Sequence, residues 1–156
     1  MKILIVVESK HLGNTRKVAV AMSEVAPITI TDIKGASRYD FFDYDIVGFG
    51  SGIYMGKHDQ RLLKFVDSLC DKEAYTFVFS TSGGPDFEQN NNPLVDILKR
   101  KNKKVLGVFS CLGLDKFFIL RLMGGMNKGH PNDEDLKHAQ EFILGIIAKY
   151  QSAVSK

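Results

Sequence analysis

Small polar residues gather in the segment that follows the first apolar run of the chain. Residues 3–7 are all aliphatic, and the next eight residues include Ser9, Gly13, Asn14 and Thr15. Apolar residues then recur at helical spacing from Val18, so this turn joins a buried strand to a helix. Free N–H groups and the helix dipole favour an anion there, above all a phosphate. The segment is a candidate phosphate site; an ordinary helix-capping turn is the alternative.

Two more segments rich in glycine and small residues follow later apolar runs. They are Gly50-Ser51-Gly52-Ile53-Tyr54-Met55-Gly56 and Ser80-Thr81-Ser82-Gly83-Gly84-Pro85. The first lacks the Gly-x-Gly-x-x-Gly spacing and follows the third strand rather than the first, which argues against a dinucleotide fingerprint. Its Tyr54 and Met55 suit a flat apolar ligand. Plain surface turns are the alternative for both segments.

The elements that must position these segments alternate along the chain. The pattern predicts strands over residues 2–7, 28–33, 45–51, 75–80 and 104–110. Apolar residues at helical spacing predict helices between them, with only a short helix in residues 35–44. Asn92-Pro93 is a typical helix start, and Asn132 or Asp133 caps the last helix.

This alternation predicts an α/β fold with helices on both faces of a parallel sheet. We expect one domain, residues 1–156, with a doubly wound five-stranded sheet in the order 2-1-3-4-5. The segments after the first, third and fourth strands would then converge on one crevice at the carboxyl edge. Residues 111–131 form the longest irregular segment, and we expect them to lie at the same edge.

The three segments, taken in order, resemble those of flavodoxins and flavodoxin-like FMN proteins. The resemblance runs the length of the chain and implies FMN bound without covalent attachment. By this resemblance, Ser9, Asn14 and Thr15 hold the phosphate. The segment around Tyr54 and the one around Ser82 enclose the isoalloxazine ring. The residues that the resemblance assigns to the cofactor are Ser9, His11, Gly13, Asn14, Thr15, Ser51, Gly52, Ile53, Tyr54, Met55, Gly56, Thr81, Ser82, Gly83 and Gly84.

The chain departs from the family pattern in three ways. The phosphate segment has one added residue, and Leu12 precedes Gly13, which leaves the role of His11 open. The net charge is +3, whereas electron-carrier flavodoxins are strongly acidic. The chain has no Trp, so the ring would stack on Tyr54 or on apolar atoms.

The resemblance implies an electron carrier that works between a reductase and an acceptor protein. An NAD(P)H-dependent FMN reductase of the quinone-reductase type is the alternative. It is favoured because the chain lacks the strong acidity of carrier flavodoxins and has a long segment after Ser110. A phosphoacceptor receiver domain shares the strand order but needs an acidic pair after the first strand. Here Glu8-Ser9 follows that strand, and the third strand ends in Ser51 rather than Asp.

Composition excludes several other classes of protein. A net charge of +3 is too small for a nucleic-acid-binding protein. No apolar run is long enough to span a membrane, and we expect a cytoplasmic protein. The spacing of the four histidines matches no zinc motif. The oligomeric state is left open.

Three further residues could do chemistry. Cys111 would lie near the crevice, but a phosphatase nucleophile needs an arginine six residues later, and Phe117 stands there. Cys70 ends an apolar helical pattern and is expected in the core. His58 is placed at a helix start, either facing the flavin or, more simply, doing no chemistry.

Overall fold

The computed structural model describes residues 1–10, 13–113 and 128–155. Its central feature is a sheet with the strand order β2-β1-β3-β5-β6. The strands are β1 (Ile3–Glu8), β2 (Ile28–Thr31), β3 (Ile46–Tyr54), β5 (Ala74–Ser82) and β6 (Lys103–Leu112). All four pairings along this path are parallel. This is the predicted flavodoxin-like order 2-1-3-4-5, counted without the short extra strand β4 (Lys57–His58).

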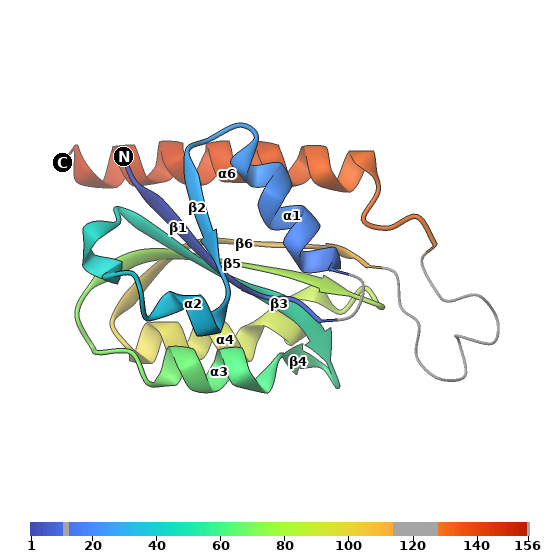
Figure 1. Cartoon of the computed structure of the whole chain (residues 1–156), viewed down its shortest axis with the longest axis horizontal. Coiled ribbons are helices and arrows are strands. Elements are labelled where there is room, and N and C mark those ends of the chain that lie inside the picture. The colour runs from blue at the N-terminus through green and yellow to red at the C-terminus, as the bar shows by residue number, and fades with distance from the viewer. Residues whose placement is uncertain (11–12, 114–127, 156) are drawn as a thin grey trace.

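Helices cover both faces of the sheet (Figure 1). The helices α1 (Asn14–Ser23) and α6 (Asp133–Val154) lie on one face, and α3 (Gln60–Asp67) and α4 (Phe87–Arg100) lie on the other. The short α2 (Ile33–Ala36) and the 3-10 turn η1 (Phe41–Asp43) connect β2 to β3. Asn132, one of the two predicted caps, caps α6 and forms a capping box with Asp135. No helix in these described ranges is long and apolar enough to span a bilayer.

Two apolar clusters fill the space between the sheet and its helices. Alternate residues of β1 point to opposite faces, so Ile3 and Ile5 enter the cluster under α1 and α6, while Leu4 and Val6 enter the one under α3 and α4. On β3 only Ile46 adds a side chain to the first cluster, and glycines occupy the next two positions that face it. A Cβ on Gly48 or Gly50 would come within 2.2 or 2.3 Å of a phenylalanine ring of β5.

The predicted start of α4 at Asn92 is wrong. The helix begins at Phe87, and Pro93 lies inside it. Pro93 therefore leaves the Gln89 carbonyl without its helical N–H donor. Asn90 and Asn91 look like loop residues in the sequence, but both are buried. The Asn91 amide donates to the Phe87 carbonyl one turn earlier and to Ser110 Oγ on β6.

The segment after the third strand also differs from the prediction. β3 continues to Tyr54 and turns back into β4, with Ile53 opposite His58 and Tyr54 opposite Lys57. The two turn residues, Met55 and Gly56, have φ values of 52° and 74°. This is the arrangement of a two-residue hairpin turn whose twist matches that of its strands. The predicted glycine-rich loop is thus a hairpin, and His58 lies on its returning strand rather than at a helix start.

Candidate functional site

The carboxyl ends of four adjacent strands lie in register. Ser51 of β3 is opposite Glu8 of β1 on one side and Ser80 of β5 on the other. Ser80 is in turn opposite Ser110 of β6. The segments that the sequence assigns to the cofactor follow these positions on β1, β3 and β5. The predicted convergence at one edge of the sheet is therefore correct.

The first turn ends in a left-handed residue at the start of α1. Gly13 is the N-cap, with φ 69° and ψ 23°. A Cβ on Gly13 would meet no atom of the described chain within 4 Å, so the described residues leave the space beside it open. Ser9 Oγ accepts a hydrogen bond at 3.4 Å from the backbone N–H of Arg16 in the first helical turn. His11, also predicted for this site, lies outside the described residues.

A buried hydrogen bond ties this turn to the segment after β5. Thr15 Oγ1 and Thr81 Oγ1 are 2.8 Å apart, and both side chains are buried. Thr15 therefore joins two of the predicted loops, and its hydroxyl is already bonded there. On the same segment, Ser82 Oγ donates to the carbonyl of Gly84 at 2.5 Å and so shapes the turn around Gly83.

Gly113 completes the junction, and sequence reasoning missed it. Its N–H donates to the Ser82 carbonyl at 2.9 Å. A Cβ on Gly113 would lie 3.0 Å from Asn14 Nδ2 and 3.2 Å from Thr81 Cβ. The close approach of these chains needs a residue without a side chain. A glycine directly after the apolar run of β6 is a signal that could have been used.

The hairpin brings Tyr54 to the first turn. The Tyr54 side chain folds across Gly52, where a Cβ would lie 2.8 Å from the phenol oxygen. Lys10 Nζ lies 5.2 Å from the centre of the Tyr54 ring, within range of a cation–π contact. Burial and the nearby Asp59 carboxylate raise the pKa of Tyr54, so the phenol stays protonated. Met55, at the tip of the hairpin, is 96% exposed.

An ion-pair cluster fixes the far side of the same hairpin. Asp59 is buried, and its carboxylate accepts from Lys10 Nζ at 2.6 Å and from the Arg61 backbone N–H at 2.8 Å. Burial alone would raise the pKa of Asp59, but these hydrogen bonds hold it below its usual value. Arg61 also pairs with Glu8 at 2.6 Å. Lys10, which the sequence did not single out, thus places a positive charge beside the predicted phosphate turn.

The side chain of Ser51, predicted to contact the cofactor, points away from the crevice. It is fully buried on the α3/α4 side, where its Oγ lies 2.8 Å from His58 Nδ1 and accepts from the Asp59 backbone N–H at 3.0 Å. On the other side of the imidazole, His58 Nε2 lies 2.8 Å from Asn91 Oδ1. Through Ser110, whose Oγ lies 2.8 Å from Ser80 Oγ, this polar chain reaches β5.

The partners of this chain define the state of His58. The Asn91 amide nitrogen donates to Phe87 and Ser110, so its oxygen is left to accept from His58 Nε2–H. In a neutral ring Nδ1 is then unprotonated and faces the Ser51 hydroxyl, whose single proton is within reach of both Nδ1 and the Gly52 carbonyl, each at 2.8 Å. Burial lowers the pKa of His58 to about 4, partly opposed by the bond to Asn91. His58 is therefore an internal support of the hairpin, not a residue that faces the crevice.

The structure places the two cysteines differently from the sequence prediction. Cys111 lies within β6 rather than after it, and burial raises the pKa of its thiol to about 12. A thiol that stays protonated is a poor nucleophile. Cys70, predicted in the core, is exposed. The apolar pattern that led to it ends one residue earlier, at the half-buried Leu69.

Most of the predicted site residues thus gather at one edge. Ser9, Gly13, Asn14 and Thr15 form the first turn, Gly52 to Gly56 form the hairpin, and Thr81 to Gly84 form the third segment. Open space beside a left-handed glycine at a helix N-terminus, with a lysine nearby, fits a phosphate group. The tyrosine of the hairpin adds an aromatic surface next to it.

Three comparisons agree with this arrangement. Residues 4–113 match the flavodoxin domain family model. A curated relative, an uncharacterised protein of Methanocaldococcus jannaschii, is 40% identical over 148 residues, covering 94% of this chain and 99% of the relative. A solved flavodoxin from the domain Archaea superposes with a TM-score of 0.72 at 14% identity, covering 97% of this chain and 99% of the other.

A solved flavoprotein from Lactobacillus acidophilus, in complex with FMN, superposes with a TM-score of 0.58 at 16% identity. The superposition covers 70% of this chain and 92% of the Lactobacillus chain. These structural likenesses show the fold. The family model spans the first strand through Gly113, and so includes every segment of the candidate site. The chain therefore belongs to the flavodoxin domain family.

Proposed function

We propose that the chain binds FMN without covalent attachment at this crevice and carries electrons between a reductase and an acceptor protein. The observation that carries the proposal is the left-handed Gly13, with open space beside it at the N-terminus of α1. The flavodoxin family and the FMN complex of the Lactobacillus acidophilus protein support the choice of ligand.

The residues of the first turn would hold the phosphate. The backbone N–H groups of the first turn of α1 lack helical acceptors, and Ser9 and Asn14 add polar side chains beside them. Lys10 is held in position by its ion pair with Asp59, and its ammonium has further N–H groups that could donate to the phosphate from the side. The hydrogen bond between Thr15 and Thr81 keeps the phosphate turn in a fixed position relative to the third segment.

Tyr54 and the segment from Thr81 to Gly84 would flank the ring. FMN supplies the one- and two-electron chemistry when bound, and the protein binds, orients and shields it. The hairpin that carries Tyr54 rests on the buried polar chain through Ser51 and His58. These buried contacts hold the hairpin in place from behind, so no side chain on the flavin side is needed to fix it.

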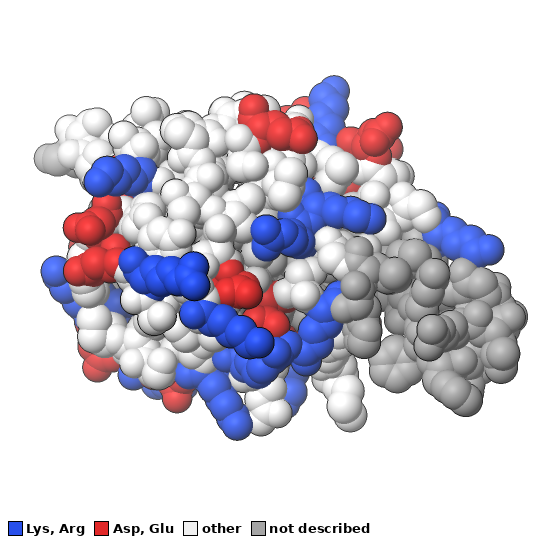
Figure 2. All heavy atoms as spheres, viewed as in Figure 1, with Lys and Arg blue, Asp and Glu red and all other residues white. Residues whose placement is uncertain are grey.

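The surface around the hairpin indicates the kind of protein partner. The exposed Met55 stands at the tip, with the cations Lys57 and Arg61 exposed nearby on β4 and α3. In Figure 2, Lys and Arg side chains predominate over the lower part of the face shown, where Figure 1 places α3 and β4. We expect redox partners whose docking face is acidic with an apolar centre. The two free cysteines, Cys70 and Cys111, suit a reducing compartment such as the cytoplasm.

Direct reduction by NAD(P)H is a second candidate function. The net charge of +3 favours it, because it suits an anionic dinucleotide better than a strongly acidic surface would. The two functions differ in one simple experiment. If NADPH is added anaerobically to the FMN-loaded protein, a carrier keeps its flavin absorbance until a reductase is supplied. An NAD(P)H-dependent enzyme loses it at once.

Titration with FMN and riboflavin tests the binding site. Hydrogen bonds to a charged group contribute about 1.5–3 kcal/mol each, so loss of the phosphate should weaken binding at least tenfold. Gly13→Asn is the matched variant, because Asn tolerates the left-handed conformation better than other side chains but projects into the open space. It should keep the stability of the fold and lose most of the preference for FMN. Equal affinities for both flavins in the unmodified protein would disprove the assignment.

A further inference from the structure

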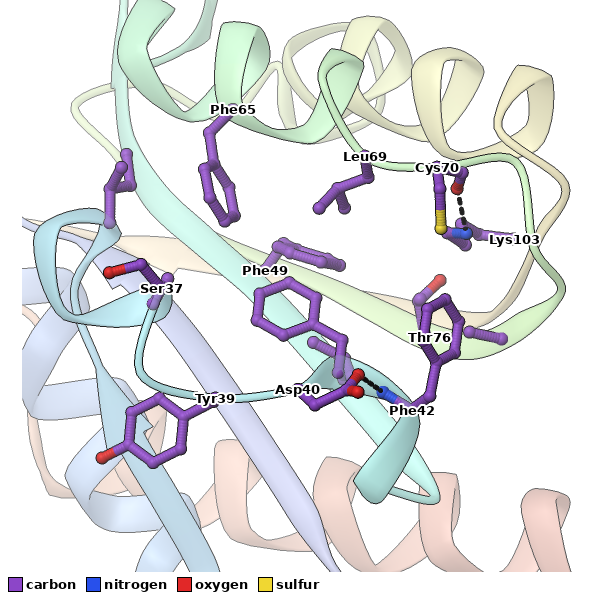
Figure 3. Close-up of a pocket in the computed structure, with 15 residues that line it drawn as sticks. Ser37, Tyr39, Asp40, Phe42, Phe49, Phe65, Leu69, Cys70, Thr76 and Lys103 are labelled. Carbon is purple, nitrogen blue, oxygen red and sulfur yellow. Dashed lines mark hydrogen bonds between the residues drawn. The ribbon is translucent and has the colours of Figure 1, made fainter.

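A cavity lies on the α3/α4 face, toward the amino ends of the strands and away from the proposed flavin site. Its volume is about 420 Å³, within the range of roughly 300–1,000 Å³ that small-molecule pockets span. Its floor is formed by β3, β5 and the first residue of β6, and its walls by α2, η1 and the end of α3 (Figure 3). None of the residues assigned to the flavin crevice lines it.

The walls are mostly apolar and aromatic. Phe41 lies between Phe49 and Phe65, with ring centres 6.2 and 6.0 Å away. Figure 3 shows Phe49, Phe65 and Leu69 directed toward the same space. Of the labelled residues, Ser37, Asp40, Phe42 and Cys70 are exposed and form the mouth. Such walls suit a flat ring or a compact hydrocarbon body.

One charged group is buried in this apolar surrounding. Lys103 is 7% exposed, and its ammonium donates to the backbone carbonyls of Cys70, at 2.8 Å, and of Lys72. Burial lowers its pKa. Two of its three N–H groups are thus used by neutral acceptors, and the ammonium also lies 6.0 Å from the centre of the Phe42 ring.

No carboxylate lies within ion-pair distance of this ammonium in the described part of the chain, although the nearby Asp71, which pairs with Lys101, favours its charged form. The ion pairs there include Lys101 with Asp71 and Lys104 with Glu73, but none with Lys103. Asp40, at the mouth, accepts from the Phe42 backbone N–H and is exposed. Lys72 is not a lining residue, but its ammonium lies 3.9 Å from the centre of the ring of Phe42, which lines the cavity. A lysine is almost never buried without a counter-charge, because desolvation of the ammonium is costly.

We propose that this cavity binds a small aromatic monocarboxylate. The carboxylate would take the remaining N–H of Lys103 and supply the missing negative charge. The ring would lie among Phe41, Phe49 and Phe65. A neutral ligand of the same shape would gain only the apolar contacts, and a cation would be repelled. The site is separate from the flavin crevice and does not depend on the proposed redox function.

The test compares matched acids and amides on the full chain in the presence of excess FMN, so that the flavin crevice is saturated if it binds flavin. Benzoate and 2-naphthoate are titrated against benzamide and 2-naphthamide by two-dimensional NMR and calorimetry, with hexanoate as the aliphatic acid. We expect saturable shifts at the cavity residues and a preference for acid over amide of roughly tenfold to hundredfold, since hydrogen bonds to charged groups contribute about 1.5–3 kcal/mol. Hexanoate should bind more weakly than 2-naphthoate.

Two variants separate the charge from the cavity. Lys103→Met keeps the apolar stem and should abolish the preference for acids while leaving amide binding unchanged. Lys104→Met removes the adjacent exposed lysine, outside the cavity, and should change neither. Ala74→Phe fills the cavity and should abolish binding of both acid and amide. If Lys103→Met does not fold, the acid–amide comparison on the unmodified chain still decides the question.

The proposal fails if no probe gives saturable shifts, or if the shifts lie away from the cavity. It also fails if acid and amide bind equally to the unmodified chain, or if Lys103→Met binds acids as before. Stronger binding of hexanoate than of 2-naphthoate would overturn the aromatic assignment.

Discussion

The buried His58 gives a measurable pH dependence of stability. Its pKa is lowered from 6.5 to about 4 in the folded chain because the ring is buried. Above pH 6.5 the ring is neutral in both states and contributes no pH dependence. Between pH 6.5 and about 4, the unfolded chain binds a proton that the folded chain does not. Stability therefore falls as the pH falls through this window, and the contribution is constant below it.

The size of the effect follows from the two pKa values. At about 1.36 kcal/mol for each pH unit, the difference between 6.5 and about 4 corresponds to about 3 kcal/mol. That is a large share of the 5–15 kcal/mol by which folded proteins are typically stable. Carboxylates with lowered pKa, such as Asp59, lose their stabilisation only below about pH 4, so the two windows hardly overlap.

The assay is urea denaturation at a series of pH values from 7.5 to 4.5. His58→Gln removes the titrating group and keeps a polar side chain, so its free energy of unfolding should vary less with pH. The exposed His138→Gln is the matched control and should follow the unmodified chain. If His58→Gln and the unmodified chain lost stability in parallel as the pH falls, His58 would not be the buried neutral group described here.

Three further predictions rest on single positions. Gly50→Ala should lower the free energy of unfolding by about 1–3 kcal/mol or more in urea denaturation, because its Cβ would meet the Phe79 ring at 2.3 Å. Gly145→Ala on α6, where a Cβ meets no described atom within 4 Å, is the control and should be neutral or stabilising. Met55→Asn should raise the thermal midpoint by the equivalent of up to about 1 kcal/mol, since Asn tolerates φ 52° better than Met; a lower midpoint would contradict the hairpin turn. If FMN binds as proposed, Lys57→Glu should lower its reduction potential by about 20 mV at low salt, the equivalent of ~0.5 kcal/mol for one electron; an unchanged or raised potential would mean that Lys57 lies too far from the ring to matter.

Much of the sheet could be predicted because buried parallel strands have a simple signature. β1 is a continuous aliphatic run, and β5 and β6 begin within one residue of their predicted starts. Their order followed from alternation with helices and the right-handed crossover rule. The gathering of three loops at one edge is a consequence of that order.

The parts that could not be predicted depend on tertiary contacts. Asn90 and Asn91 indicate a loop by type, yet they are helical, and Asn91 is bonded to His58 and Ser110. Met55 is an unusual residue for a position with positive φ, so the hairpin carried no turn signal. The face to which Ser51 points depends on the register of β3, which its neighbouring glycines obscure.

The packing of β5 against β3 also restricts which substitutions these two strands can accept during evolution. The Phe77 and Phe79 rings occupy the volumes that side chains at positions 48 and 50 would fill. A larger residue at either position can become fixed only after, or together with, a smaller one opposite it. Positions 48 and 77, and likewise 50 and 79, are therefore expected to co-evolve, although almost thirty residues separate the members of each pair. Lineages of this protein should carry a larger residue at position 48 or 50 only where the phenylalanine opposite it has been replaced by a smaller residue.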